Sequence, residues 1–268
     1  MLDPFDRTID YLRISVVDRC DLRCVYCMGA EGVEKKRHED ILSYEQIEQV
    51  VQAAAGLGFR KVRLTGGEPL IRRGITCLVE KLAAVDGIED LCMTTNGTRL
   101  AGMAQALKAA GLNRVNVSLD TLEADRFREI TRGGDIRPVL EGIDAAVGAG
   151  LTPVKINMVI FEDTTEDEVA TMQEFCRGNG LTLQKIMQFS LYDRKDLKVR
   201  FRSERPPRCK ECNRLRLTAD GYFKPCLFSE QEIPVDFGDI EGSIRAAVAA
   251  KPRAGSRCAN RSMRQIGG

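Results

Sequence analysis

Six of the ten cysteines in this 268-residue sequence fall into two tight groups, and the first group has the spacing of an iron–sulfur ligand set. Cys20, Cys24 and Cys27 form a CxxxCxxC pattern. A [4Fe–4S] cluster takes thiolate ligands, and three of them leave one iron open for a ligand that is not protein. A structural zinc ion is the alternative, but it needs four ligands, and the only histidine, His38, lies well beyond Cys27. The pattern therefore favours a cluster with an open iron.

The second group, Cys209, Cys212 and Cys226, again offers three thiolates and no histidine. It is compatible with a second cluster that has an open iron. It is also compatible with a zinc ribbon that takes Cys258 as its fourth ligand. The cysteines outside the two groups are scattered and have the character of small buried hydrophobic residues: Cys77, Cys92, Cys176 and Cys258.

Two arginines lie between the cysteines of the second group. Arg214 and Arg216 alternate with Leu215 and Leu217, so a strand here would present both guanidinium groups on one face. Neighbouring guanidinium groups beside a cluster form an anion site suited to phosphate. Two solvated arginines on a hairpin are the alternative.

Short apolar runs alternate with segments of helical spacing before residue 190. The predicted strands are 12–17, 61–65, 91–95, 114–119, 154–160 and 181–187, and helical segments include 44–56, 100–110, 139–150 and 166–176. This alternation predicts a parallel sheet. A closed eight-unit barrel needs about 250 residues, so we expect an α/β fold with an open six-unit (β/α)6 partial TIM barrel.

Polar and glycine-rich segments follow the predicted strands at their carboxyl ends, the face that carries the chemistry in parallel barrels. Gly66, Gly67 and Glu68 follow the second strand, Thr95, Asn96 and Gly97 come at the end of the third, and Ser118 closes the fourth. Glycines let the backbone approach a ligand, and its carbonyls can accept from an ammonium group. A plain turn between strand and helix is the alternative for the glycine pair.

The character of the sequence changes near residue 190. We expect residues 1–190 to form the barrel and residues 191–268 to form a small C-terminal iron–sulfur region. Residues 193–208 carry seven basic side chains, either as a solvated linker or as extra contacts for an anion. A hairpin is expected around Asp220 and Gly221, and a helix over 240–250.

Composition limits the class of protein. The formal net charge is +1, whereas nucleic-acid binders usually carry a basic excess, so no nucleic-acid partner is expected. Residues 1–20 lack the apolar run of a signal peptide, and no segment has the length of a membrane span. We therefore expect a cytoplasmic protein with reduced thiols and no membrane partner.

The CxxxCxxC group, with Tyr26 before its last cysteine, and the Gly66–Pro69 turn resemble the radical S-adenosylmethionine superfamily. In that superfamily the open iron chelates S-adenosylmethionine, and an electron from the cluster cleaves the sulfonium to give a 5′-deoxyadenosyl radical. The glycine turn holds the methionyl amino group. The cofactor supplies this chemistry, and the protein supplies the position.

A closer resemblance covers nearly the whole chain. It is carried by the segments LRISVVDRCDLRCVYC (12–27), RLTGGEPL (63–70), TTNG (94–97), NVSLDT (116–121), CNRLRLTADG (212–221), PCLF (225–228) and the Gly267-Gly268 end. These segments resemble the molybdenum cofactor biosynthesis protein A family, the GTP 3′,8-cyclases. The resemblance implies a lyase that converts GTP to 3′,8-cyclo-7,8-dihydro-GTP. It also implies two [4Fe–4S] clusters, a flavodoxin- or ferredoxin-type electron donor, a downstream cyclic pyranopterin monophosphate synthase and a possible homodimer.

The resemblance also assigns roles to residues. The first cluster would be held by Cys20, Cys24 and Cys27, and the second, which would bind the guanine edge, by Cys209, Cys212 and Cys226. Contacts to GTP would come from Arg13, Arg63, Thr94, Lys155, Arg214 and Arg216. Contacts to S-adenosylmethionine would come from Tyr26, Gly66, Gly67, Glu68, Ser118 and Met187. The tail ending in Gly267 and Gly268 would enter the active site, where narrow glycines can pass.

One departure from the family pattern keeps other functions open. The family has several dozen more residues between the sixth strand and the second cysteine group, whereas only 22 positions separate Met187 from Cys209 here. A radical enzyme acting on a peptide or another metabolite is one alternative. A non-catalytic iron–sulfur or zinc-binding relative is the other.

Overall fold

A nine-stranded sheet forms the centre of the molecule in the computed structural model, which describes residues 1–32, 36–191 and 208–266. The strand order is β6-β5-β4-β3-β2-β1-β7-β8-β9. Its first part is parallel throughout and consists of β1 (Tyr11–Ser15), β2 (Lys61–Thr65), β3 (Asp90–Thr95), β4 (Arg114–Ser118), β5 (Lys155–Ile160) and β6 (Thr182–Met187). All six strands lie where the sequence predicts them.

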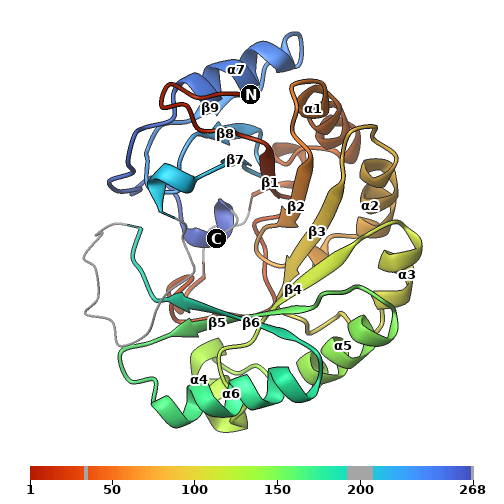
Figure 1. The fold of residues 1–268 in the computed structure, drawn as a ribbon, viewed down its shortest axis with the longest axis vertical. Helices are drawn as coiled ribbons and strands as arrows, with labels where there is room; N and C mark the ends of the chain where they lie inside the picture. The colour runs from red at the N-terminus through yellow and green to blue at the C-terminus, as the bar shows by residue number, and fades with distance from the viewer. Residues whose placement is uncertain (33–35, 192–207, 267–268) are drawn as a thin grey trace.

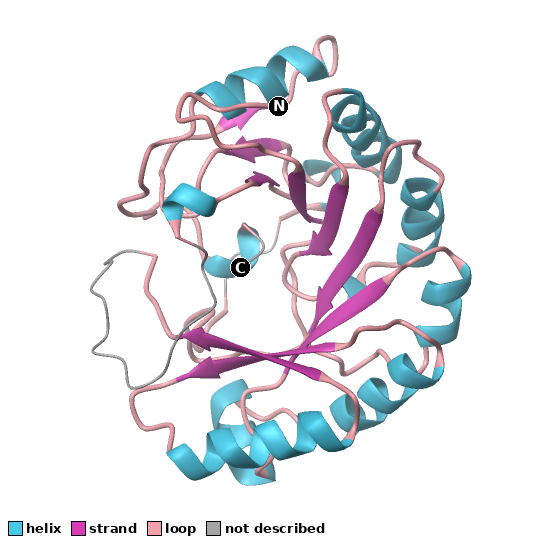
Figure 2. Ribbon diagram, viewed as in Figure 1, coloured by secondary structure: helices cyan, strands magenta, loops and turns pink. Residues whose placement is uncertain are grey.

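Helices cover the outer side of the curved sheet (Figures 1 and 2). They are α1 (Tyr44–Gly56), α2 (Ile75–Ala83), α3 (Ala104–Ala109), α4 (Ala124–Thr131), α5 (Arg137–Gly148) and α6 (Glu166–Gly178). The helix α1 begins at a capping box in which Ser43 accepts from the backbone of Gln46. The helix α3 starts later than expected, because 98–103 form turns. This arrangement confirms the open six-unit barrel.

The C-terminal region extends the same sheet. β7 (Arg214–Leu217) pairs in parallel with β1, and β8 (Tyr222–Lys224) and β9 (Ile233–Pro234) follow in antiparallel order. Gly221 has a φ of 84° in the predicted hairpin turn. The helix α7 (Ile240–Ala249) packs against α1 (Figure 1). The division near residue 190 stays a prediction, since 192–207, which include most of the basic run, lie outside the described residues.

Strand β1 joins the two parts of the sheet and sets the register of its inner face. Leu12 and Ile14 are fully buried in the core. Their neighbour Arg13 points the other way, and it lies in register with Arg63 on β2 and with Arg216 on β7. Side chains in register on parallel strands share a face, so the fold gathers these arginines inside the curve of the sheet.

No helix of the described part of the chain is long and apolar enough to cross a membrane.

Candidate active site

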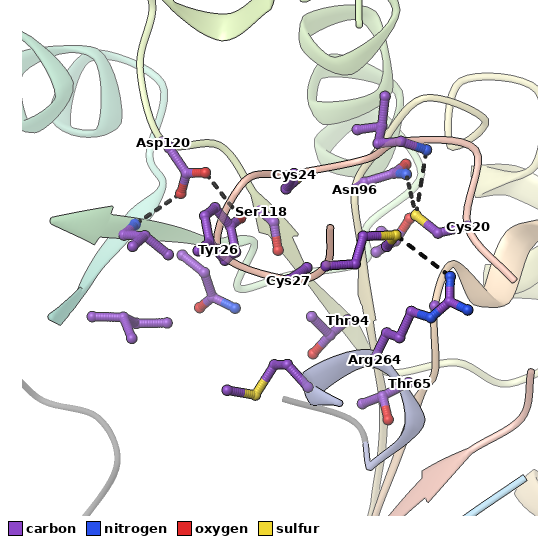
Figure 3. Close-up of a pocket in the computed structure, with 18 of the residues that line it drawn as sticks. Cys20, Cys24, Tyr26, Cys27, Thr65, Thr94, Asn96, Ser118, Asp120 and Arg264 are labelled. Carbon is purple, nitrogen blue, oxygen red and sulfur yellow. Dashed lines mark hydrogen bonds between the residues drawn. The ribbon is translucent and has the colours of Figure 1, made fainter. Parts of the chain in front are cut away.

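The first cysteine group lies in the loop after β1, at the carboxyl end of the parallel strands. Cys20, Cys24 and Cys27 line one cavity together with the Gly66-Gly67 turn after β2 (Figure 3). All three thiols are half-buried. The loops of neighbouring strands thus bring together residues that lie more than forty positions apart in the sequence.

The chemistry of these thiols fits an iron–sulfur cluster. Burial raises the pKa of Cys20 to about 11 and that of Cys27 to about 12. Metal ions at the sulfurs would reverse this effect, because a positive charge stabilises the thiolate. The backbone N–H of Leu22 and the amide of Asn96 donate to Cys20 Sγ over 3.4 and 3.8 Å, contacts that also suit a cluster ligand.

A single metal ion fits less well. Among the residues that the structure describes, no three His, Cys, Asp or Glu side chains converge closely enough to hold one ion. In a four-iron cluster each thiolate binds a different iron, so its ligands lie further apart than those of a zinc ion. For the second cysteine group, a cluster rather than zinc stays a prediction.

The glycine turn packs directly against the chain that leads into the cysteine loop. Gly67 N donates to Val17 O over 2.8 Å, and Glu68 N donates to Arg19 O over 2.7 Å. A Cβ on Gly67 would overlap the carbonyl of Arg19, and Gly66 has a φ of 145°. Only glycine therefore allows this approach.

Glu68 lies behind the cavity rather than in its wall. Its buried carboxylate accepts from Leu70 N, from Thr95 Oγ1 and from Asn96 N over 2.7 to 3.0 Å. Burial raises its pKa to about 7, against the opposing effect of these donors. Since Asn96 reaches Cys20, Glu68 acts in this structure as a positioning residue, and its predicted direct contact with the cofactor stays a prediction.

Tyr26 is held by a carboxylate that the sequence analysis did not select. Its hydroxyl donates to Asp120 Oδ2 over 2.9 Å, and Asp120 Oδ1 accepts from Val159 N over 2.8 Å (Figure 3). Burial raises the pKa of Asp120 to about 6. The predicted contacts Ser118 and Met187 line the same cavity. Asp120 could have been found from the sequence by its position just after β4, at the carboxyl end of the strand.

Four arginines line a second cavity inside the sheet. Arg13, Arg63, Arg214 and Arg216 contribute to it from β1, β2 and β7, and none of the described residues that line it is acidic. Arg63 donates to Thr94 Oγ1 over 2.9 Å and to the hydroxyl of Tyr11. Arg216 is only 4% exposed, so the alternative of solvated hairpin arginines is wrong for this residue.

Lys155 is the one predicted substrate contact that does not line this cavity. It lies on β5 in register with Asn116, two residues before the cavity-lining Asn157, but is not one of the lining residues. Its contact with the substrate stays a prediction.

The second cysteine group lines a third cavity, which also includes Arg214 and Arg216. Cys209, Cys212 and Cys226 meet there beside Lys251, whose ammonium group donates to Arg214 O and Pro225 O over 2.6 and 2.7 Å. Burial raises the pKa of Cys226 and lowers that of Lys251. Cys258 donates to Asn260 Oδ1 and lies in a buried cluster against which Cys226 packs, but it does not line this cavity, so the zinc-ribbon alternative stays open.

The three cavities share walls. The first and second have Thr94, Asn157, Ile186 and Phe189 in common, and the second and third have Arg214, Arg216 and Leu227 in common. The cavities therefore adjoin one another, from the first cysteine group past the arginines to the second. Sequence reasoning gave the three sets of residues but not this adjacency.

The C-terminal segment reaches into this space. Arg264 lines the first cavity, where its Nη1 lies 3.5 Å from Met28 Sδ. Ile266 is buried, and its carbonyl accepts from Arg216 Nη1 over 3.0 Å. Gly267 and Gly268 lie outside the described residues. The entry of the two glycines into the site therefore stays a prediction.

Comparison with known proteins defines the class. The profile of the Radical SAM superfamily matches residues 14–176. The structure of Streptococcus suis SuiB bound to the precursor peptide SuiA is similar with a TM-score of 0.69 and 16% identity, over 89% of this chain and 67% of SuiB. The structure of anSMEcpe with bound AdoMet gives a TM-score of 0.63 and 16% identity, over 91% and 81% of the two chains. These likenesses show the fold, and the protein is a radical SAM protein.

Sequence relatives define the family within that class. A GTP 3′,8-cyclase from Alkaliphilus oremlandii (strain OhILAs) is 38% identical over an alignment of 320 residues that covers all of both chains. A GTP 3′,8-cyclase from Moorella thermoacetica (strain ATCC 39073 / JCM 9320) is 42% identical over 92% of this chain and 88% of its own. The chain belongs to the GTP 3′,8-cyclase family. The Alkaliphilus alignment exceeds the 268 residues of this chain, so that relative is longer.

Proposed function

We propose that this protein converts GTP to 3′,8-cyclo-7,8-dihydro-GTP, the activity for which its relatives are named, in the biosynthesis of the molybdenum cofactor. The observation that carries the proposal is the set of three adjoining cavities between the two cysteine groups, with four arginines lining the middle one. A nucleoside triphosphate carries about four negative charges and requires such donors. A neutral metabolite or peptide would not use the positive charge of these guanidinium groups.

The first cysteine group would hold the radical-generating cluster. When bound to Cys20, Cys24 and Cys27, a [4Fe–4S] cluster with S-adenosylmethionine supplies a 5′-deoxyadenosyl radical that takes the 3′ hydrogen of GTP. The chain's own part is to orient the cofactor. The contacts would come from Tyr26, Gly66, Gly67, Ser118 and Met187, with Glu68 acting through Asn96.

The second cysteine group would hold a second [4Fe–4S] cluster and, at its open iron, the guanine edge. Three thiolates, the buried Lys251 and two arginines surround this site. The positive side chains suit a cluster whose thiolate ligands bring negative charge. Placing guanine here leaves the ribose between the two cysteine groups, which is where the reaction needs it.

The arginines would bind the triphosphate and hold the substrate in one orientation. Burial and the neighbouring arginines lower the pKa of Arg13, which shows how much this cavity lacks negative charge. Thr94 and Lys155 would add contacts, Arg214 and Arg216 would hold charge near the reacting atoms, and the tail glycines Gly267 and Gly268 would close the site. The guanidinium groups would thus supply positive charge to the phosphates of the substrate.

The wider setting follows from this chemistry. The cluster needs a one-electron reductant, for which a flavodoxin or ferredoxin is suited, and a cyclic pyranopterin monophosphate synthase would consume the product. We place the protein in the cytoplasm, where free thiols persist, with GTP rather than nucleic acid or membrane as its partner. We also propose that it can form a homodimer.

Product formation tests the proposal. Anaerobically reconstituted protein should contain about eight irons per chain and should convert GTP, with S-adenosylmethionine and a reductant, to the cyclic nucleotide. GTP should also alter the EPR signal of the second cluster. If 5′-deoxyadenosine forms without any cyclic nucleotide, and GTP does not change the EPR signal of the second cluster, the substrate is a different molecule.

A further inference from the structure

Asn116 has a buried acceptor that points into the second cavity. We call it the arginine cavity, because Arg13, Arg63, Arg214 and Arg216 line it. It lies in the middle of β4, is 2% exposed and is one of the residues that line this cavity. The sheet register places it between Thr94 on β3 and Lys155 on β5. Its side chain therefore faces the space in which the substrate is expected.

Only one end of the Asn116 carboxamide is satisfied. Its Nδ2 donates to Asn157 Oδ1 over 3.1 Å. Its Oδ1 is fully buried and accepts from no group in the described part of the chain. A buried acceptor without a donor is unfavourable, so such a group points to a ligand that completes it.

The chemistry of this acceptor differs from that of the rest of the cavity. The arginines donate and so suit phosphate oxygens, but a carboxamide oxygen cannot serve a phosphate, which is itself an acceptor at neutral pH. The same ligand must therefore also offer a donor near Asn116. In a nucleotide the candidates are the ribose hydroxyls and the N–H groups of the base.

The position of Asn116 decides between the ribose hydroxyls and the N–H groups of the base. Thr94 and Asn157, the neighbours of Asn116, line both the arginine cavity and the cavity of the first cysteine group. Guanine is expected at the opposite end, beside the second cysteine group. The part of the nucleotide that lies next to Asn116 is then the ribose.

We infer that Asn116 Oδ1 accepts a hydrogen bond from a ribose hydroxyl and selects ribonucleotides over their deoxy analogues. This inference rests on the proposed use of GTP. With Asn157 fixing the carboxamide, the contact would hold the sugar so that its C3′ edge faces the first cysteine group. Asn116 would thus be a specificity-determining residue of the substrate site.

Binding measurements with matched nucleotides test this role. We would measure the dissociation constants of GTP, 2′-deoxyGTP, 3′-deoxyGTP and ITP by equilibrium dialysis, with reconstituted protein, S-adenosylmethionine and no reductant. Wild-type protein should bind GTP about tenfold more tightly than one of the two deoxy analogues. Asn116→Leu should lose that preference, whereas the same change at the exposed Asn179 should keep it.

A second variant separates the contact from a general effect on folding. Asn116→Asp keeps an acceptor at this position, so it should retain the preference while its added charge weakens the binding of every nucleotide. A preference that survives in Asn116→Leu would overturn the inference. So would a change confined to the comparison of GTP with ITP, which would place Asn116 on the base. Wild-type protein that binds no GTP would instead reject the proposed function.

Discussion

Gly67 determines how closely the glycine turn approaches the first cysteine loop. Because a Cβ at this position would overlap the carbonyl of Arg19, Gly67→Ala should displace the chain just before Cys20. We expect the first cluster to be lost and the second to remain, so the iron content should fall to about half. Iron analysis after anaerobic reconstitution, together with cleavage of S-adenosylmethionine, measures this effect.

Gly148 provides the matched control, since it ends α5 and a Cβ there would meet no atom within 4 Å. Gly148→Ala should leave the iron content unchanged. Equal iron content in wild-type protein and Gly67→Ala would contradict the role given to the glycine turn.

At the scale of single residues, the sequence predicts what depends on local spacing. The two cysteine groups and the alternation of Arg214 with Arg216 lie within short segments, so their geometry follows from the chain itself. Asp120, Lys251 and Arg264 were not predicted, because each gains its place from contacts with residues far away in the sequence. The sequence around a charged residue does not show whether the fold buries its side chain.

The C-terminal segment is the element whose placement depends most on buried charge. Arg261 binds both carboxylate oxygens of Glu232 at 2.7 and 2.8 Å and Asp220 at 2.7 Å. The fully buried Lys224 adds a 3.1 Å contact to Glu232. This group of residues, the tail clamp, ties 261–266 to the hairpin β7–β8 and so fixes the path of the tail into the site.

Arg261→Met should release the tail. Removing one partner leaves buried carboxylates short of positive charge, which lowers the free energy of unfolding by about 2–4 kcal/mol. We also expect less cyclic nucleotide at unchanged iron content. Thermal unfolding and product assays measure the two effects. Arg137→Met, which removes a solvent-exposed pair with Asp135, is the control and should leave the stability unchanged. Similar behaviour of the two variants would contradict the clamp.

The tail clamp also makes a pH prediction. Burial alone would raise the pKa of Asp220, but hydrogen bonds from Lys36, Thr218 and Arg261 outweigh it and hold the pKa at about 2. A depressed pKa stabilises the fold above the ordinary value of 3.8, and that contribution is lost as pH falls from about 4 to 2.

Asp220→Asn should therefore be less stable than wild type by about 1–2 kcal/mol at pH 6, and the difference should shrink as pH falls below about 4. Urea unfolding of both proteins from pH 3 to pH 7, followed by circular dichroism, measures the difference. A gap that stays constant over this range would show that Asp220 does not act through its charge.

Elements were the most predictable part of the structure. The apolar runs gave all six barrel strands, and Asp220-Gly221 gave the hairpin. The start of α3 at Ala104 was missed, because 98–103 have apolar spacing compatible with a helix but form turns. Helix ends depend on capping and packing that periodicity does not report.

For the whole molecule, the decisive contact is the pairing of β1 with β7. These strands lie about two hundred positions apart, yet their parallel pairing puts Arg13 beside Arg216 and places the arginine cavity between the cavities of the two cysteine groups. Parallel pairing over such a separation leaves no local pattern, so the sequence predicted both ends of the site without predicting how they meet. How the two ends of the site lie relative to each other follows only from the folded structure.

Transfer of one hydrogen atom tests this arrangement most directly. Protein reduced in the presence of S-adenosylmethionine and GTP deuterated at C3′ should yield 5′-deoxyadenosine that carries one deuterium, together with the cyclic nucleotide. This result requires a radical made at Cys20, Cys24 and Cys27 to reach a ribose held by the arginines. Unlabelled 5′-deoxyadenosine from the same mixture would contradict the account, because it would mean that the two halves of the site do not hold one substrate.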